Sequence, residues 1–345
     1  MLRRFFLCFG GKSWYDDQKA KGGEHMKKQY DIVALGELLI DFTENGVSAQ
    51  GNPLFEANPG GAPCNLLAMA AKLGDKCAFI GKVGDDIFGR QLRAALQEAG
   101  IDDTALLTDP DAPTTLAFVK NGPDGEREFT FLRENGADIR LRPEDLPEEL
   151  LQSARIFHFG SLSLTHEGVR AATRRAVEIA RASGALVSFD PNLRPALWDS
   201  LDQASEQIAW GLAQCDILKI ADNEAVFMTG EDEPHEAALT LRRQYPNIRL
   251  LFLTRGAGGS SVYHESGSVY VPACRLGDAV DTTGAGDTFG GCVLHHVLLH
   301  GIHRLNNDTL PRVLRYANAA AGLITQRKGA LRSMPTREEI LGLLK

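Results

Sequence analysis

Short apolar runs alternate with amphipathic stretches along most of the chain. Residues 32–35 and 77–80 are apolar runs that each end at a glycine, as buried strands often do. Between them, residues 65–73 have apolar side chains at helical spacing and stop at Gly74. The alternation continues with strands near 156–159, 186–189, 217–220 and 250–254, and with helices near 88–99, 167–183, 199–213 and after 286. This order predicts an α/β fold, a three-layer α/β/α sandwich around a mostly parallel central sheet.

Two regions interrupt this alternation. Residues 38–58 and 113–133 have period-two patterns typical of strands, and residues 121–125 form a hairpin-turn sequence, Asn-Gly-Pro-Asp-Gly. Antiparallel pieces inserted into a parallel sheet predict a small β-sheet lid. Because the edge of a small exposed sheet tends to be paired or covered, the lid also predicts a homodimer that forms through it.

The first 25 residues differ from the rest of the chain. Residues 2–9 have two basic side chains and a short apolar stretch that resembles a signal peptide only weakly, and residues 12–25 are polar. Periodic, foldable sequence begins after Met26. We therefore expect residues 1–25 to be a disordered or non-native extension, and residues 26–345 to form the folded domain.

The composition narrows the classes of partner. The 345 residues are 43% hydrophobic and 24% charged, which is ordinary for a globular protein. A net charge of −8 without a basic stripe argues against nucleic acid and anionic membranes as partners, and no apolar run reaches the length of a membrane span. Six cysteines are scattered without a C-x-x-C pair, which favours a reducing, cytoplasmic environment over a disulfide framework or a zinc site.

The segment from Asp281 to Asp287, Asp-Thr-Thr-Gly-Ala-Gly-Asp, precedes an apolar, helix-like stretch. Backbone N–H groups at a helix N-terminus have no intrahelical partner, so a glycine-rich turn there can bind an anion. A carboxylate beside the anion would repel it, but could take the proton from a hydroxyl that attacks a phosphoryl group. The segment suggests phosphoryl transfer to an alcohol; taken alone, it fits a structural helix cap equally well.

Polar side chains also follow several predicted strands. Ligands of open α/β sheets bind at the carboxyl ends of strands. For any single residue, capping a helix is the more common role. Because so many polar residues end strands at the same edge of one sheet, a shared site explains them better. These residues are Asp41, Asp190, Asn192, Arg194, Lys219, Asp222, Asn223, Glu224, Thr254, Arg255 and Gly256.

Other familiar motifs are absent. The chain has no G-x-x-x-x-G-K-[ST] and no G-x-G-x-x-G after its first strand, which argues against a P-loop kinase and a Rossmann dehydrogenase. His296, His300 and His303 lie at helical spacing, but no H-E-x-x-H accompanies them. They fit a solvated or interface helix face better than a zinc site.

Two motifs make the chain similar to the ribokinase-like carbohydrate kinases, also called the phosphofructokinase B family. The first runs from Gly60 through Asn65 to Gly89, and the second is residues 281–294. The resemblance covers about residues 31–335. It implies a ribokinase-like fold with a lid, ATP and Mg²⁺ as cofactors, and phosphorylation of a sugar hydroxyl. Cys292 stands where the family usually has alanine or glycine.

The resemblance also implies a role for each matching residue. Asp287 resembles the general base, and the N–H groups of Gly284, Ala285 and Gly286 would form the anion hole for the transferring phosphoryl group. Substrate-binding residues would be Asp41, Gly60, Gly61, Asn65, Arg133, Asp190, Asn192 and Arg194. Nucleotide-binding residues would be Lys219, Glu224, Thr254, Gly256, Gly259 and, at the adenine edge, Asn318. The residues matching a K⁺ site are Asp281, Thr283, Gly329 and Ser333.

The resemblance is incomplete at the predicted Mg²⁺ site. Glu224 would organise the ion through water. Many family members have an asparagine three residues before this glutamate, where the present chain has Ala221. Asp222 or Asn223 would then have to compensate.

Within the family, residues 131–138 and 189–198 resemble fructokinases. The expected reaction is the ATP-dependent phosphorylation of a primary hydroxyl, converting fructose to fructose 6-phosphate, with Arg133 reaching the sugar from the lid. The close alternative is a 2-keto-3-deoxygluconate kinase, in which Arg133 and Arg194 would bind the substrate carboxylate. Ribokinase comes third, and a nucleoside kinase of the same fold is a further alternative. A non-catalytic sugar sensor is the alternative from another class, and the intact Asp287 argues against it.

Overall fold

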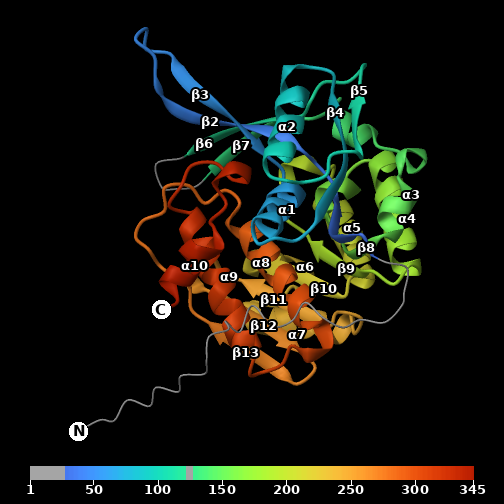
Figure 1. Cartoon of the computed structure of the whole chain (residues 1–345), viewed down its shortest axis with the longest axis vertical. Coiled ribbons are helices and arrows are strands. Elements are labelled where there is room, and N and C mark those ends of the chain that lie inside the picture. Colours follow the sequence, from blue (N-terminus) through green and yellow to red (C-terminus); the bar gives the residue numbers. More distant parts are fainter. Residues whose placement is uncertain (1–27, 122–126) are drawn as a thin grey trace.

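The large central sheet of the computed structural model has nine strands (Figure 1). The structure describes residues 28–121 and 127–345. From edge to edge the strands are β13 (Gly267–Val271), β12 (Ser260–His264), β11 (Leu250–Thr254), β10 (Ile217–Ala221), β9 (Leu186–Asp190), β8 (Ala154–Gly160), β1 (Tyr30–Leu35), β4 (Cys77–Gly84) and β5 (Leu106–Asp109). The strands from β11 to β5 are parallel, and β12 and β13 add an antiparallel edge. The prediction of a mostly parallel sheet is confirmed.

Helices cover both faces of this sheet. One face packs against α1 (Ala62–Lys72), α2 (Ile87–Glu98), α8 (Ala285–His300), α9 (Leu310–Ile324) and α10 (Arg337–Leu343). The other packs against α3 (Glu148–Gln152), α4 (Glu167–Ala182), α5 (Leu201–Gln214), α6 (Asp222–Thr229) and α7 (Pro234–Gln244). In β1, Ile32 and Ala34 join the first hydrophobic cluster, and Val33 and Leu35 join the second. Burial on both faces explains the continuous apolar run and confirms the three-layer sandwich.

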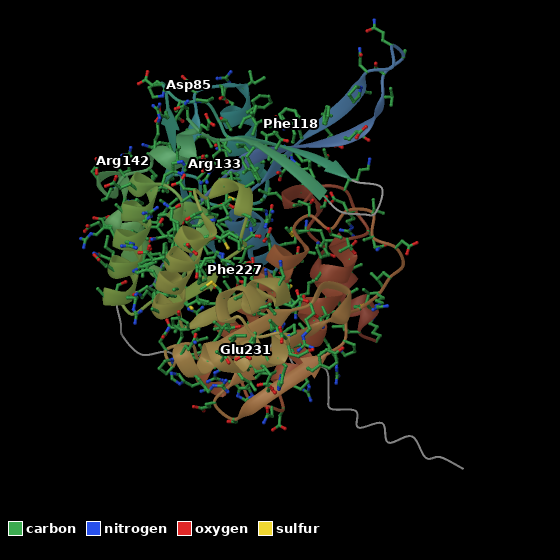
Figure 2. The ribbon with its side chains drawn as sticks, turned by 180° about the vertical axis from the view of Figure 1, so that it is seen from behind. Asp85, Phe118, Arg133, Arg142, Phe227 and Glu231 are labelled. Atoms are coloured by element: carbon green, nitrogen blue, oxygen red, sulfur yellow. The ribbon has the colours of Figure 1, made fainter. Side chains whose placement is uncertain are left out.

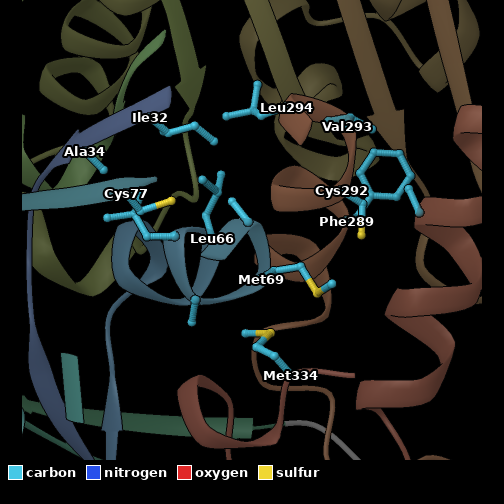
Figure 3. Close-up of a cluster of buried hydrophobic side chains, with 14 of the residues drawn as sticks. Ile32, Ala34, Leu66, Met69, Cys77, Phe289, Cys292, Val293, Leu294 and Met334 are labelled. Carbon is cyan, nitrogen blue, oxygen red and sulfur yellow. The ribbon is translucent and has the colours of Figure 1, made fainter. Parts of the chain in front are cut away.

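Helices α1 and α8 pack closely, and Figure 3 shows Leu66 and Met69 of α1 in one cluster with Phe289 and Cys292 of α8. The hydrogen bond between Asn65 and Asp287 joins the first turns of the two helices. Gly290 and Gly291 of α8 face α1, and a Cβ on Gly291 would lie 2.7 Å from the main-chain oxygen of Leu66. Phe289 and Cys292 belong to the same buried cluster as Leu66. Cys292 therefore acts as a small apolar residue in the core, which fits its place in the sequence motif.

A separate four-stranded sheet, the lid sheet, extends from the main body (Figure 1). Its strands are, in order, β3 (Pro53–Gly60), β2 (Leu39–Val47), β6 (Leu116–Asn121) and β7 (Arg127–Leu132). β2 and β6 pair in parallel and the other pairs are antiparallel, so the lid sheet is mixed rather than purely antiparallel as expected. The N-terminal extension (1–25) and most of the turn predicted at 121–125 lie outside the described residues.

His296, His300 and His303, expected on a solvated or interface helix face, divide between core and surface: His303 follows α8 and is exposed, whereas His296 is buried. His296 is 1% exposed, packs edge-on against Tyr316 and stacks on His300. Burial lowers its pKa well below the usual range for histidine. The ring is therefore part of the core between α8 and α9. Within residues 28–121 and 127–345, no group of three or more His, Cys, Asp or Glu side chains could hold a metal ion.

Crossing a membrane requires a helix of about 20 mostly apolar residues, which sets a length and a composition for the helices of the described chain. None of those found in residues 28–121 and 127–345 combines the necessary length with sufficient apolar character.

Candidate active site

The Asp-Thr-Thr-Gly-Ala-Gly-Asp segment forms a turn that leads directly into α8. Gly284 is the N-cap residue and has a φ of 75°, in the left-handed region that favours glycine. A Cβ there would lie 2.8 Å from the Cβ of Ala330. No side chain caps α8, so the N–H groups of its first turn are open to an anion. The N–H of Ala285 makes a long turn bond of 3.3 Å to the oxygen of Thr282, which an anion could displace.

Two cavities meet at this turn. The smaller has a volume of about 380 Å³ and the larger a volume of about 640 Å³. Thr282 and Gly286 line both of them. A group bound in one cavity can therefore meet a group bound in the other at the N-terminus of α8.

Asp287 lies in the wall of the small cavity, in the first turn of α8. Its Oδ2 accepts a hydrogen bond from Nδ2 of Asn65 at 2.8 Å. Burial, followed by the charge of Asp190, raises the pKa of Asp287 to about 6. The hydrogen bond from Asn65 and the charges of Lys219 and Arg194 limit this rise. The carboxylate is thus ionised near neutral pH and basic enough to take a proton from a hydroxyl.

Lys219, in β10, places a positive charge against the turn. Its Nζ lies 3.0 Å from Oδ2 of Asp190, and a Cβ on Gly286 would lie 3.0 Å from the same nitrogen. Burial opposes the charged form of Lys219, but the nearby carboxylates, Asp190 first, outweigh burial and raise its pKa. The ammonium therefore stays charged beside the predicted anion hole.

The loop after β9 contributes two of its three predicted residues to the small cavity. Asn192 and Arg194 line it, and Asn192 has a φ of 43°, which asparagine tolerates better than most residues. Asp190 differs, because its side chain is buried and its carboxylate pairs with Lys219. Asp190 holds Lys219 in place, and its expected role in binding substrate stays a prediction.

The loop at the start of α1 shapes the opposite wall. Asp41, Gly61 and Asn65 line the small cavity. A Cβ on Gly60 would collide with the Asp41 carboxylate, and one on Gly61, where φ is 123°, would collide with the main-chain oxygen of Glu37. The space at both positions is therefore too small for any residue other than glycine. Gly60 acts by leaving room for Asp41.

Further residues that the sequence analysis did not name individually also line this cavity. Leu39, Phe131 and Leu162 provide apolar wall, and Leu39 and Phe131 belong to the lid strands β2 and β7. Apolar residues carry no binding signal in a sequence, because a core needs the same types. Glu37 also lines the cavity, and its position just after a strand that ends near Gly36 was a signal that could have identified it.

Arg133, expected to reach the sugar from the lid, is directed into the protein (Figure 2). Its guanidinium donates to Oδ2 of Asp138 at 2.8 Å, to Oγ1 of Thr165 at 3.0 Å and to the oxygen of Leu162 at 2.9 Å. The side chain is 3% exposed and lines neither cavity. Three internal acceptors hold Arg133, which anchors the end of β7, and its expected contact with the substrate stays a prediction.

Glu224 is buried at the start of α6 and lines neither cavity. Its carboxylate oxygens accept the N–H groups of Leu193 at 2.7 Å and Ala221 at 2.8 Å. Burial raises the pKa of Glu224, and the charge of Lys219 opposes the rise. Ala221 contributes only its main-chain N–H to the hydrogen bond with Glu224, which explains why alanine fits at this position. A role for Glu224 with Mg²⁺ through water stays a prediction.

Four of the six residues expected to bind nucleotide line the large cavity, namely Thr254, Gly256, Gly259 and Asn318, whereas Lys219 lines the small one and Glu224 neither. Gly259 has a φ of 91°, and a Cβ there would collide with the oxygen of Val271. Oδ1 of Asn318 accepts from Ser260 at 2.8 Å, and its Nδ2 donates to the oxygens of Val271 and Pro272. The side-chain amide of Asn318 is thus already hydrogen-bonded within the protein. Asn318 also lines the large cavity, so its expected contact with the adenine edge stays a prediction.

The four residues matched to a monovalent cation site gather behind the turn. Oδ1 of Asp281 accepts the N–H of Thr283 at 2.9 Å and its hydroxyl at 2.7 Å, and Oδ2 accepts the N–H of Gly329 at 3.1 Å. A Cβ on Gly329 would lie 3.7 Å from Oγ of Ser333. Carboxylate, hydroxyl and carbonyl oxygens are the ligands that hard cations prefer, so the donor set fits such an ion.

Residues 29–337 match the family described as pfkB family carbohydrate kinase. A probable fructokinase-2 of Arabidopsis thaliana is 43% identical over 317 residues, which cover 91% of this chain and 95% of that protein. A fructokinase from Xylella fastidiosa with bound ATP is 31% identical, with a TM-score of 0.82 over 92% of this chain and 98% of that one. A fructokinase double mutant from Vibrio cholerae O395, bound to fructose, ADP and a potassium ion, is 28% identical, with a TM-score of 0.82 over 93% of this chain and 100% of that one.

Proposed function

Because the chain belongs to the pfkB family of carbohydrate kinases, we propose that it transfers the γ-phosphoryl group of ATP to the primary hydroxyl of fructose, forming fructose 6-phosphate. The position of Asp287 carries this proposal. Its carboxylate has a raised pKa, is held by Asn65 and lies at the N-terminus of α8, where the two cavities meet. Similarity to fructokinases over most of their length supports fructose as the sugar.

In the proposed reaction, fructose occupies the small cavity and ATP the large one. Asp287 accepts the proton of the attacking hydroxyl, while the N–H groups at the start of α8 and the ammonium of Lys219 stabilise the charge on the phosphoryl group. Leu39 and Phe131, from the lid sheet, give the small cavity apolar surface. Exclusion of water by such a cover limits wasteful hydrolysis of ATP.

Mg²⁺, when bound with ATP, neutralises charge on the β- and γ-phosphates. Both oxygens of Glu224 already accept backbone N–H groups, so Glu224 fits a contact through water and not direct ligation. We infer that phosphate oxygens and water hold most of the ion's ligand positions. A K⁺ ion among Asp281, Thr283 and their neighbours would neutralise the Asp281 carboxylate and stiffen the turn.

The substrate is tested by ATP consumption with a panel of acceptors, namely fructose, 2-keto-3-deoxygluconate, ribose, tagatose and adenosine, each with and without K⁺. We expect the highest kcat/KM with fructose. Arg194 lines the small cavity and could pair with a carboxylate, which keeps the keto acid as the second candidate. Turnover of 2-keto-3-deoxygluconate well above that of fructose would overturn the choice of sugar. Sugar binding without turnover of any acceptor would indicate a sensor.

The proposed base predicts the pH dependence of the reaction. Asp287 must be ionised to accept a proton, so kcat/KM should be low in acid and rise as the pH passes through about 6. Asn65→Leu removes a hydrogen bond that lowers this pKa, so the midpoint should move to higher pH. Profiles of kcat/KM against pH for both proteins test this. An unchanged midpoint in the variant would contradict the coupling of Asn65 to Asp287.

We propose that the lid sheet mediates a homodimer. Val47 is 63% exposed and Leu54 is 47% exposed on the β2–β3 hairpin, so pairing would cover apolar surface. Light scattering at micromolar concentration should give the mass of a dimer, and Val47→Glu with Leu54→Glu should give a monomer. Leu343→Glu, at a similarly exposed position in α10, serves as the control. A monomeric mass for the unmodified protein would count against the dimer.

A further inference from the structure

Glu37 is a buried acid in the wall of the small cavity that the proposed reaction does not use. It lies two residues beyond the end of β1 and is 3% exposed. Its Oε1 accepts the N–H of Ala62, the first residue of α1, at 2.9 Å. The N-cap residue Gly61 has no side chain that could cap this helix, so Glu37 provides a cap from another element. One turn further on, α1 presents Asn65 to Asp287.

The hydrogen bond to Ala62 uses one of the two carboxylate oxygens of Glu37. Among residues 28–121 and 127–345, Ala62 is the one other residue that donates a hydrogen bond to this carboxylate. Burial raises the pKa of Glu37 to about 7, and its own N–H and the charge of Arg133 limit the rise. Arg133 gives its own hydrogen bonds to Asp138 and two further acceptors, so it forms no ion pair with Glu37. Each carboxylate oxygen has two lone pairs, so Glu37, which lines the small cavity, can accept from a ligand hydroxyl in addition to these N–H groups.

We propose that Glu37 is a further sugar-binding residue with two separate tasks. Oε1 fixes the first turn of α1 and through it the position of Asn65 against the base. Oε2 accepts a hydrogen bond from a hydroxyl of the sugar in the small cavity. Asp41 lines the same cavity and adds a second polar group to its wall. The inference rests on the proposed sugar kinase activity and adds a contact that helps to select a hydroxylated acceptor.

Glu37→Gln separates the two tasks. The N–H of Ala62 requires an oxygen, so the amide oxygen of glutamine takes the place of Oε1 and its NH₂ group replaces Oε2. The helix cap is kept, while the group offered to the sugar changes from acceptor to donor. At a pH well above 7, where Glu37 is ionised, we expect KM for fructose to rise about 10- to 100-fold, as for loss of a hydrogen bond to a charged group, with kcat within about threefold of wild type.

Glu37→Ala removes both oxygens. KM should rise as in the glutamine variant, and kcat should also fall by about tenfold, because the first turn of α1 loses its cap and Asn65 its fixed position. Recovery of kcat in Glu37→Gln relative to Glu37→Ala distinguishes positioning from general damage to the fold. Thermal melting confirms that both variants fold, and Glu265→Gln, at an exposed turn, is the matched control.

Fructose analogues that each lack one hydroxyl identify the bonded group. One analogue should lose affinity for the wild type by about 10- to 100-fold and lose little further for Glu37→Gln, because the same interaction cannot be removed twice. An unchanged KM in Glu37→Gln, or equal losses with every analogue in both proteins, would overturn the sugar contact. If the wild type prefers another panel sugar, the same measurements use that sugar. Failure of fructose as a substrate then rejects the proposed substrate and leaves the test of Glu37 intact.

Discussion

Asp287→Asn is expected to lower kcat for fructose by about 10²- to 10⁴-fold, the usual span for loss of a general base. The amide keeps the size of the side chain, and its oxygen can still accept from Asn65, but it cannot take the proton of the attacking hydroxyl. Fructose binding should stay nearly intact, because the rest of the cavity wall is unchanged. Steady-state kinetics measures the first effect, and calorimetry with fructose alone measures the second.

The matched control is Asp308→Asn, which makes the same charge change in an exposed loop before α9. Its kcat should equal that of the wild type. A near-normal kcat in Asp287→Asn would remove Asp287 from the role of base. A large loss of fructose affinity would instead assign Asp287 to substrate binding.

Lys219→Met should have the second largest effect. It removes the positive charge beside Gly286, so kcat should fall by about 10²-fold or more, as for loss of a group that stabilises transition-state charge. It also leaves Asp190 buried without its partner, at a cost of about 3–5 kcal/mol in the free energy of unfolding. Because Lys219 lowers the pKa of Asp287, the midpoint of the acid limb should move to higher pH.

A double variant separates the loss of turnover from the loss of stability that Lys219→Met causes. Lys219→Met with Asp190→Asn removes the uncompensated charge, so much of the lost stability should return in thermal or denaturant unfolding. The low kcat should persist, because the ammonium is still missing from the turn. Recovery of both stability and turnover in the double variant would contradict a direct role for Lys219 in phosphoryl transfer.

The elements that the sequence predicted correctly have a local cause. The run 32–35 is apolar because β1 is buried on both faces, and Gly74 marks the end of α1 to within two residues. The pattern missed β12 and β13, because an antiparallel edge pair with Ser260, Ser261 and Gly267 is not a continuous apolar run. It also missed α6, which begins at Asp222, directly after β10.

The site residues likewise divide into those that local sequence identifies and those whose role depends on the folded structure. Gly61 and Gly284 could be recognised because their backbone conformations restrict the residue type at those positions. The local sequence does not indicate the hydrogen-bond partners of Arg133 and Asn318, because whether a polar side chain faces a cavity or the interior depends on other elements. Glu37 was missed although it follows a strand, since its cap on α1 joins residues that are 25 positions apart.

By itself, the sequence determined the layered α/β fold, the lid strands and the glycine-rich turn before Asp287, since each is encoded in the period or backbone needs of a few neighbouring residues. Only the tertiary structure decided which polar groups work together. Asn65 and Asp287 are 222 positions apart, and close packing of α1 on α8 brings them within 2.8 Å. Burial and the neighbouring charge of Asp190 then raise the pKa of Asp287. These are properties of the folded surroundings, which local sequence does not record.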